Sequence, residues 1–161
     1  MGANSSFKSF DLSIVASQIQ RVLVVEDASD LRQLNVDVLI DAGYQVDVAD
    51  DGTTAWAAIQ LTQYDLLITD QFLHRLSGVE LVRKIHDASI PLPIIMVTET
   101  LPTWEFVLYP CLQAVTMLRK PYTMAKFLGM VKSVLAKTAP VGVGIAPSKW
   151  ERELEAVGFP E

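Results

Sequence analysis

Five polar side chains that could take part in metal or phosphoryl chemistry stand at the ends of short apolar runs. They are Glu26, Asp27, Asp70, Thr98 and Lys120. Most of these runs have the composition of strands that are buried on both faces of a sheet. Because the carboxyl ends of parallel strands meet at one edge of the sheet, we expect the five side chains to converge on one crevice.

The types of these side chains indicate phosphoryl transfer assisted by a divalent cation. Three carboxylates held close together repel one another, so at least one would have a raised pKa unless a cation joined them. A small set of oxygen ligands with an open side is typical of Mg²⁺, which keeps several of its waters. Mg²⁺, the Lys120 ammonium and the Thr98 hydroxyl could together neutralise three phosphoryl oxygens. An aspartate among them could act as a nucleophile and form an aspartyl-phosphate.

Strands and helices are expected to alternate along most of the chain. The apolar runs that predict strands are 22–25, 45–48, 66–68, 94–97 and 115–118. Run 45–48 alternates polar and apolar residues, so it should lie at an edge of the sheet. Helical patterns cover 31–39, 53–61, 79–86 and 124–135. This order predicts an α/β fold with a doubly wound, five-stranded parallel sheet that has helices on both faces.

Two helical regions carry more specific predictions. The buried face of the first helix should consist of Leu31, Leu34, Val38 and Leu39, with Gly43 at the C-terminal cap. The stretch 101–113 lies between Pro102 and Pro110. We expect one short, irregular helix there, because Pro110 should end or kink it.

The composition changes towards both ends of the chain. Residues 1–19 are mixed in character and are expected to form an N-terminal extension, whereas residues 20–138 should form the domain. Residues 139–161 predict a linker rich in proline and glycine, followed by a short amphipathic helix with a capping box. Such a short helix is marginal alone, so we expect it to dock on the domain or on a partner.

Charge and cysteine content exclude several classes of function. The 161 residues carry 13 Lys+Arg against 19 Asp+Glu, a net charge of -6, so nucleic acid is not an expected partner. The single cysteine, Cys111, excludes an internal disulfide and a cysteine-based zinc cluster, and it fits a reducing compartment. No apolar run approaches the length of a bilayer span, and the N-terminus lacks a secretory layout. We therefore expect a cytoplasmic protein that does not bind membranes.

Over about residues 20–138 the sequence resembles the receiver domains of two-component response regulators. The motifs are Val24-Val25-Glu26-Asp27, Leu67-Ile68-Thr69-Asp70 with Gly78 eight residues later, Met96-Val97-Thr98, and Leu118-Arg119-Lys120-Pro121. The set is specific in its order and spacing. The resemblance implies a flavodoxin-like sheet with strand order 2-1-3-4-5.

The resemblance also implies a role for each site residue. Asp70 looks like the phosphoacceptor, and Thr98 and Lys120 look like the switch hydroxyl and the lysine that pairs with the phosphoryl group. Asp27 would be the direct Mg²⁺ ligand, with Glu26 acting mostly through water and Asp70 as a further ligand. The backbone carbonyl of Phe72 would complete the set. The Lys120–Pro121 peptide bond is expected to be cis.

The resemblance also implies that the phosphoryl group comes from a histidine kinase or a histidine phosphotransfer protein. It implies no enzyme activity beyond Mg²⁺-dependent self-phosphorylation and self-dephosphorylation at Asp70. Its output would pass through an unknown partner protein, and the sequence leaves a homodimer open.

Several residues depart from the pattern that the resemblance implies. Leu73 and His74 stand where relatives usually carry methionine and proline. Glu99 replaces a small residue, and Met117 replaces the usual aromatic one. These departures support an alternative hypothesis, a phosphorylation-independent binding module with the receiver fold. A phosphatase or mutase does not fit, because Phe72 stands where its second acid–base carboxylate would be needed.

Overall fold

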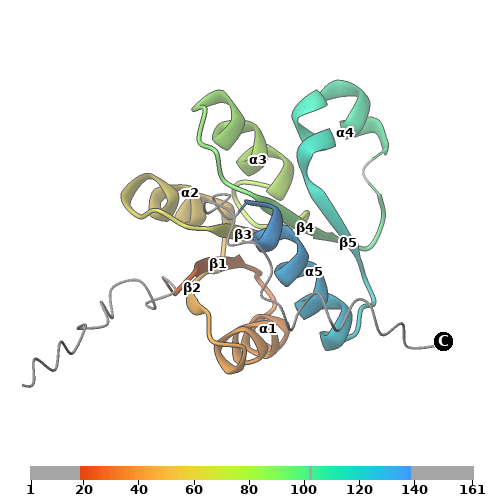
Figure 1. Ribbon diagram of the computed structural model, residues 1–161. Helices are drawn as coiled ribbons and strands as arrows, with labels where there is room; N and C mark the ends of the chain where they lie inside the picture. The colour runs from red at the N-terminus through yellow and green to blue at the C-terminus, as the bar shows by residue number, and fades with distance from the viewer. Residues whose placement is uncertain (1–18, 102, 139–161) are drawn as a thin grey trace, which may run out of the picture.

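The protein folds as a parallel five-stranded sheet with helices on both faces, in a computed structural model that describes residues 19–101 and 103–138 (Figure 1). The strands are β1 (Arg21–Val25), β2 (Gln45–Ala49), β3 (Leu66–Asp70), β4 (Ile94–Thr98) and β5 (Thr116–Arg119). The helices are α1 (Ser29–Asp41), α2 (Gly52–Leu61), α3 (Gly78–Asp87), α4 (Thr103–Leu108), the 3-10 helix η2 (Pro110–Ala114) and α5 (Met124–Thr138). The strand order is β2-β1-β3-β4-β5, which confirms the predicted order and the edge position of 45–48. Within the described part of the chain, none of the helices has the length and apolar character that crossing a membrane requires.

Alternating side chains of the central strands build two core layers. On β1, Leu23 and Val25 pack into the layer under α2 and α3, whereas Val22 and Val24 pack into the layer under α1 and α5. Figure 1 shows these two pairs of helices on opposite sides of the sheet. Strands β3 and β4 are buried along their whole length. This burial on both faces is what their unbroken apolar composition predicts.

The buried face of α1 differs from the prediction. Leu39 is buried as expected, but Leu34 is 46% exposed and the neighbouring Asn35 is buried instead. The Asn35 side-chain amide exchanges hydrogen bonds with the Tyr122 hydroxyl, at 3.1 and 3.2 Å. Because this pairing satisfies the buried amide, a polar residue replaces leucine on the buried face. Gly43 follows α1 with a φ of 94°, as expected for a C-terminal cap.

The prediction of one irregular helix over 101–113 is wrong. Two separate elements form there, α4 and η2, and Tyr109 stands between them. Pro110 occupies the start of η2, where its missing N–H group costs no hydrogen bond. The predicted extension 1–19 and the predicted C-terminal helix lie outside the described residues, apart from Ile19.

A capping box begins α3 and fixes the segment that follows the site. The Ser77 hydroxyl accepts a hydrogen bond from the Glu80 N–H at 3.2 Å, and the Ser77 N–H donates to Glu80 Oε2 at 2.9 Å. We expect Ser77→Ala to lower the free energy of unfolding by about 1 kcal/mol, because one N-terminal N–H group of the helix loses its acceptor. Urea unfolding measures this loss.

Ser133→Ala provides the control for the capping prediction. Ser133 lies in the interior of α5 and is exposed, so this substitution removes no cap and should leave stability unchanged or slightly raised. Equal stabilities of the two variants would show that the capping box contributes nothing.

Candidate functional site

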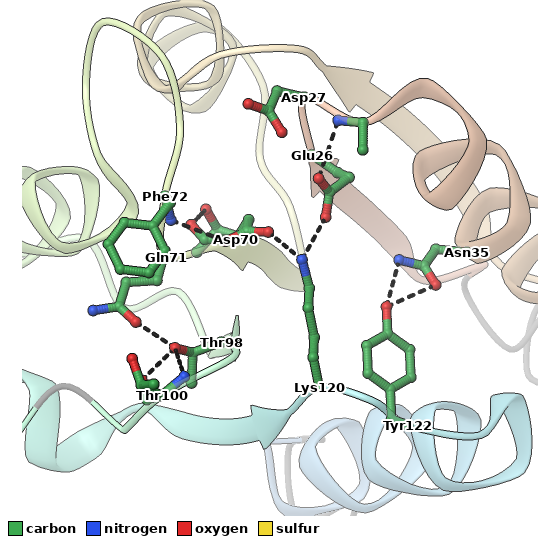
Figure 2. A network of polar contacts seen from close by, with 12 residues as sticks. Glu26, Asp27, Asn35, Asp70, Gln71, Phe72, Thr98, Thr100, Lys120 and Tyr122 are labelled. Carbon is green, nitrogen blue, oxygen red and sulfur yellow. Dashed lines mark hydrogen bonds and ion pairs between the residues drawn. The ribbon is translucent and has the colours of Figure 1, made fainter.

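The carboxyl edge of the sheet gathers the polar residues that follow β1, β3, β4 and β5. The strand register sets Val25 beside Thr69, Asp70 beside Val97, and Thr98 beside Arg119. Residues one step beyond these pairs therefore project from the same edge of the sheet. Figure 2 shows Glu26, Asp70 and Lys120 directed towards one another, with Thr98 further along the edge.

Lys120 bridges two buried carboxylates. Its Nζ lies 2.5 Å from Asp70 Oδ2 and 3.5 Å from Glu26 Oε2. The Glu26 and Asp70 residues are only 4% and 7% exposed. The other oxygen of Asp70, Oδ1, accepts a hydrogen bond from the Phe72 N–H at 2.9 Å. Asp70 is therefore held at both oxygens, by an ammonium and by the main chain of the β3–α3 loop.

The charge in this cluster is unbalanced. Burial and the nearby charge of Asp70 raise the pKa of Glu26 to about 7, although the Ala28 N–H group and the Lys120 ammonium act to lower it. Burial alone would lower the pKa of Lys120, but its hydrogen bond to Asp70 and the two carboxylate charges raise it. One ammonium thus faces two carboxylates, and a further cation would be electrostatically favoured there.

Among the described residues, Asp27 is paired with His74 and not with Lys120. Its Oδ2 lies 2.9 Å from Nδ1 of His74, whose side chain is mostly exposed. Asp27 and His74 line an open hollow together with Ala28, Asp50, Asp51 and Arg75. Across residues 19–101 and 103–138, no three acidic, histidine or cysteine side chains are clustered closely enough to form a ready metal site. Of the predicted ligands, the structure therefore brings together the side chains of Glu26 and Asp70, with Asp27 on the neighbouring loop.

Thr98 is fully buried at the end of β4. Its hydroxyl is hydrogen-bonded to the Gln71 side chain and to the main chain of Thr100. In the described part of the chain no hydrogen bond joins Thr98 to Asp70. Lys120 is tied to the same strand, because its N–H donates to the Thr98 carbonyl at 2.8 Å. The Lys120–Pro121 peptide bond is cis, as predicted.

Gln71 is the residue of this site that the sequence-based reasoning missed. It is 3% exposed, directly follows Asp70 and reaches Thr98 on the neighbouring strand. The available signal was a polar residue directly after Asp70, just beyond the strand predicted over 66–68. Of the residues that depart from the receiver pattern, Met117 packs against the core layer under α2 and α3, and Glu99 is exposed.

Comparison with known proteins shows which family the chain belongs to. Residues 22–132 match the sequence profile of the response regulator receiver domain. The chain belongs to the response regulator receiver family. It is therefore a receiver domain of the kind found in two-component systems, and such domains are generally not classical enzymes.

Individual relatives agree with this assignment. The chain is 35% identical over 116 residues to response regulator RppA of Synechocystis sp., an alignment that covers 71% of this chain and 50% of RppA. It thus spans about half the length of the curated relatives it matches. The solved structure of chemotaxis response regulator CheY4 of Vibrio cholerae matches with a TM-score of 0.66 and 30% identity, over 72% of this chain and 98% of CheY4.

A third relative was solved with ligands. The structure of response regulator TrrA from Thermotoga maritima, in complex with Mg²⁺ and BeF, matches with a TM-score of 0.63 and 26% identity. That alignment covers 72% of this chain and 99% of TrrA.

Proposed function

We propose that this receiver accepts a phosphoryl group on Asp70 with the help of Mg²⁺, and that its donor is a histidine kinase or a histidine phosphotransfer protein. The observation that carries the proposal is the setting of the Asp70 carboxylate. It lies at the carboxyl edge of the sheet, 2.5 Å from the Lys120 ammonium and beside the buried Glu26. Output would then pass to a partner protein by contact, and a homodimer is one form that such contact could take.

The residues present fit a magnesium ion. Glu26, Asp27 and Asp70 offer only oxygen ligands, and the backbone carbonyl of Phe72 would add another. The Lys120 ammonium alone neutralises only part of the charge of the two buried carboxylates, Glu26 and Asp70. When bound, Mg²⁺ would neutralise charge on the phosphoryl oxygens. The TrrA complex with Mg²⁺ and BeF supports this part of the proposal by family resemblance.

The chain's own residues would carry out the transfer in the following way. A carboxylate oxygen of Asp70 attacks the phosphorus of a phosphohistidine; a new O–P bond forms as the P–N bond breaks. The electron pair of the broken bond stays on the imidazole, which takes a proton. The Lys120 ammonium stabilises the negative charge on the phosphoryl oxygens, and the Thr98 hydroxyl donates a hydrogen bond to one of them. Because Asp70 is already held by Phe72 and Lys120, its carboxylate is positioned before the phosphoryl donor arrives.

The remaining assignments are part of the same proposal. Residues 20–138 would be the functional receiver unit, residues 1–19 an N-terminal extension, and residues 139–161 a linker and a short docking helix. A cytoplasmic location fits the single thiol, Cys111.

Intact-mass spectrometry after incubation with acetyl phosphate and Mg²⁺ tests the proposed function. We expect the wild-type protein to gain one phosphoryl group and Asp70→Asn to gain none, because an amide is a poor nucleophile towards phosphorus. A chelator should abolish the gain in the wild type. Asp87→Asn, a change at an exposed aspartate at the end of α3, is the matched control and should still be phosphorylated.

A wild-type protein that gains no mass would contradict the proposal. The same would hold if Asp70→Asn were phosphorylated as fully as the wild type. The phosphorylation-independent binding module would then be the better hypothesis, with His74 and Glu99 as the first residues to replace.

A further inference from the structure

Gln71 forms a buried bridge between the strand that ends in Asp70 and the strand that ends in Thr98. Its side-chain oxygen is hydrogen-bonded to the Thr98 hydroxyl, and the two residues are 3% and 0% exposed. Figure 2 shows the Gln71 side chain extending from the β3 end to Thr98, while the Asp70 carboxylate is directed towards Lys120. Gln71 thus contacts the hydroxyl that the proposed function requires, from the position next to the phosphoacceptor.

The single hydrogen of the Thr98 hydroxyl is already committed to nearby acceptors. A hydroxyl has one hydrogen to donate and two lone pairs that can accept. The Thr100 N–H donates to Thr98 Oγ1 at 3.2 Å. The one hydrogen faces two acceptors, the side-chain oxygen of Gln71 and the carbonyl oxygen of Thr100, the latter at 2.5 Å. The hydroxyl must therefore give up existing partners before it can donate to a phosphoryl oxygen.

The backbone of Gln71 is fixed from both sides. Its N–H donates to the Val97 carbonyl at 3.0 Å, and its carbonyl accepts from the Gly78 N–H at 2.9 Å. One contact ties Gln71 to β4, and the other ties it to the first turn of α3. The Gln71 side chain thus extends from a fixed backbone. A backbone shift therefore cannot move it together with Thr98 towards Asp70.

We propose that Gln71 is a positioning residue that holds the Thr98 hydroxyl in its resting orientation and so sets the phosphoryl affinity of the site. This inference rests on the proposed function, because it concerns a phosphoryl group on Asp70. A phosphoryl group can accept a hydrogen bond from the Thr98 hydroxyl only by displacing Gln71 and the Thr100 carbonyl. The Gln71–Thr98 contact therefore favours the unphosphorylated arrangement.

Binding of beryllofluoride in the presence of Mg²⁺ tests the inference, with beryllofluoride as the stand-in for the phosphoryl group. Fluorine NMR measures the bound fraction directly. We expect Gln71→Met, which keeps the length of the side chain without its amide, to bind about fivefold more tightly than the wild type. That is the size of effect expected when one competing hydrogen bond is removed. In a Thr98→Val background, the same change should have no effect on affinity.

Two further variants separate this role from general packing. Gln71→Asn keeps the amide but is one methylene too short to reach Thr98, so it should behave like Gln71→Met. Gln71→Asn also provides the test of the inference if Gln71→Met does not fold. Gln60→Met makes the same substitution at an exposed position of α2 and should leave the affinity at the wild-type value.

The outcomes distinguish this inference from the proposed function. If wild-type protein binds beryllofluoride and both Gln71 variants bind it equally well, the inference fails and the proposed function stands. The inference also fails if Gln71→Met tightens binding by the same factor in the Thr98→Val background. If a Gln71 variant binds and the wild type does not, the inference is supported. If neither binds, the proposed function fails and the inference fails with it.

Discussion

Gly78→Ala is expected to lower the free energy of unfolding by about 2–3 kcal/mol. A Cβ at this first residue of α3 would lie 2.1 Å from the carbonyl oxygen of Asp70 and 3.0 Å from the Cα of Gln71. Both atoms belong to a backbone that the Val97 carbonyl also holds, so neither can move aside as the end of a flexible side chain would. The gain in helix propensity, about 1 kcal/mol, is too small to offset this overlap.

Gly129→Ala is the matched control for the Gly78 prediction. Gly129 also lies in a helix, but a Cβ there meets no atom within 4 Å, so alanine should raise stability by about 0.5–1 kcal/mol. Urea unfolding of the two variants should give changes of opposite sign. Gly78→Ala should also slow phosphorylation by acetyl phosphate, because the overlap strains the main chain that positions Asp70. A Gly78 variant as stable as the Gly129 variant would contradict the prediction.

The carboxyl-edge site was predictable because it depends on strand ends alone. Apolar runs mark where β1, β3, β4 and β5 end, and parallel pairing then brings the following residues to one edge whatever the loops do. The resemblance to receivers supplied the strand order, which periodicity alone does not determine. Glu26, Asp70 and Lys120 therefore came together as expected.

The unpredicted features depend on contacts between distant segments. Asn35 replaces Leu34 on the buried face of α1 only because Tyr122 satisfies its amide, and the helical pattern contains no information about that partner. In the same way, Asp27 pairs with His74 across two loops. The contact between Gln71 and Thr98 became visible only once the structure placed the two side chains together. Sequence patterns locate elements and their ends, whereas these polar pairings are decided in the folded protein.

Replacing the Glu26 carboxyl is expected to stabilise the protein at and above neutral pH. Burial is the main reason that the pKa of Glu26 rises from 4.5 to about 7 in the folded protein. Between these two values the folded state binds a proton that the unfolded state has lost, so stability falls as the pH rises through this window. By about pH 8 the ionised Glu26 costs about 2–3 kcal/mol. Glu26→Gln keeps the shape and an acceptor for the Ala28 N–H group, but it cannot ionise.

Urea unfolding across pH, in buffer with a chelator, tests this prediction. Glu26→Gln should match the wild type near about pH 4 and exceed its stability by about 2–3 kcal/mol near about pH 8. Glu80→Gln is a control of opposite sign: hydrogen bonds from Ser77 lower the pKa of Glu80, so its carboxylate stabilises above the unfolded pKa and loses this contribution as the pH falls. A Glu26→Gln advantage that is constant with pH would contradict the prediction.

Addition of Mg²⁺ should reduce the destabilisation that the ionised Glu26 causes. The excess negative charge that destabilises the site without metal is the charge that a divalent cation would neutralise. Mg²⁺ should therefore raise the stability of the wild type more than that of Glu26→Gln, and so narrow the difference between them at high pH. If Mg²⁺ stabilised both proteins equally, Glu26 would have no part in holding the cation, and the proposed ligand set would shrink to Asp27, Asp70 and the Phe72 carbonyl.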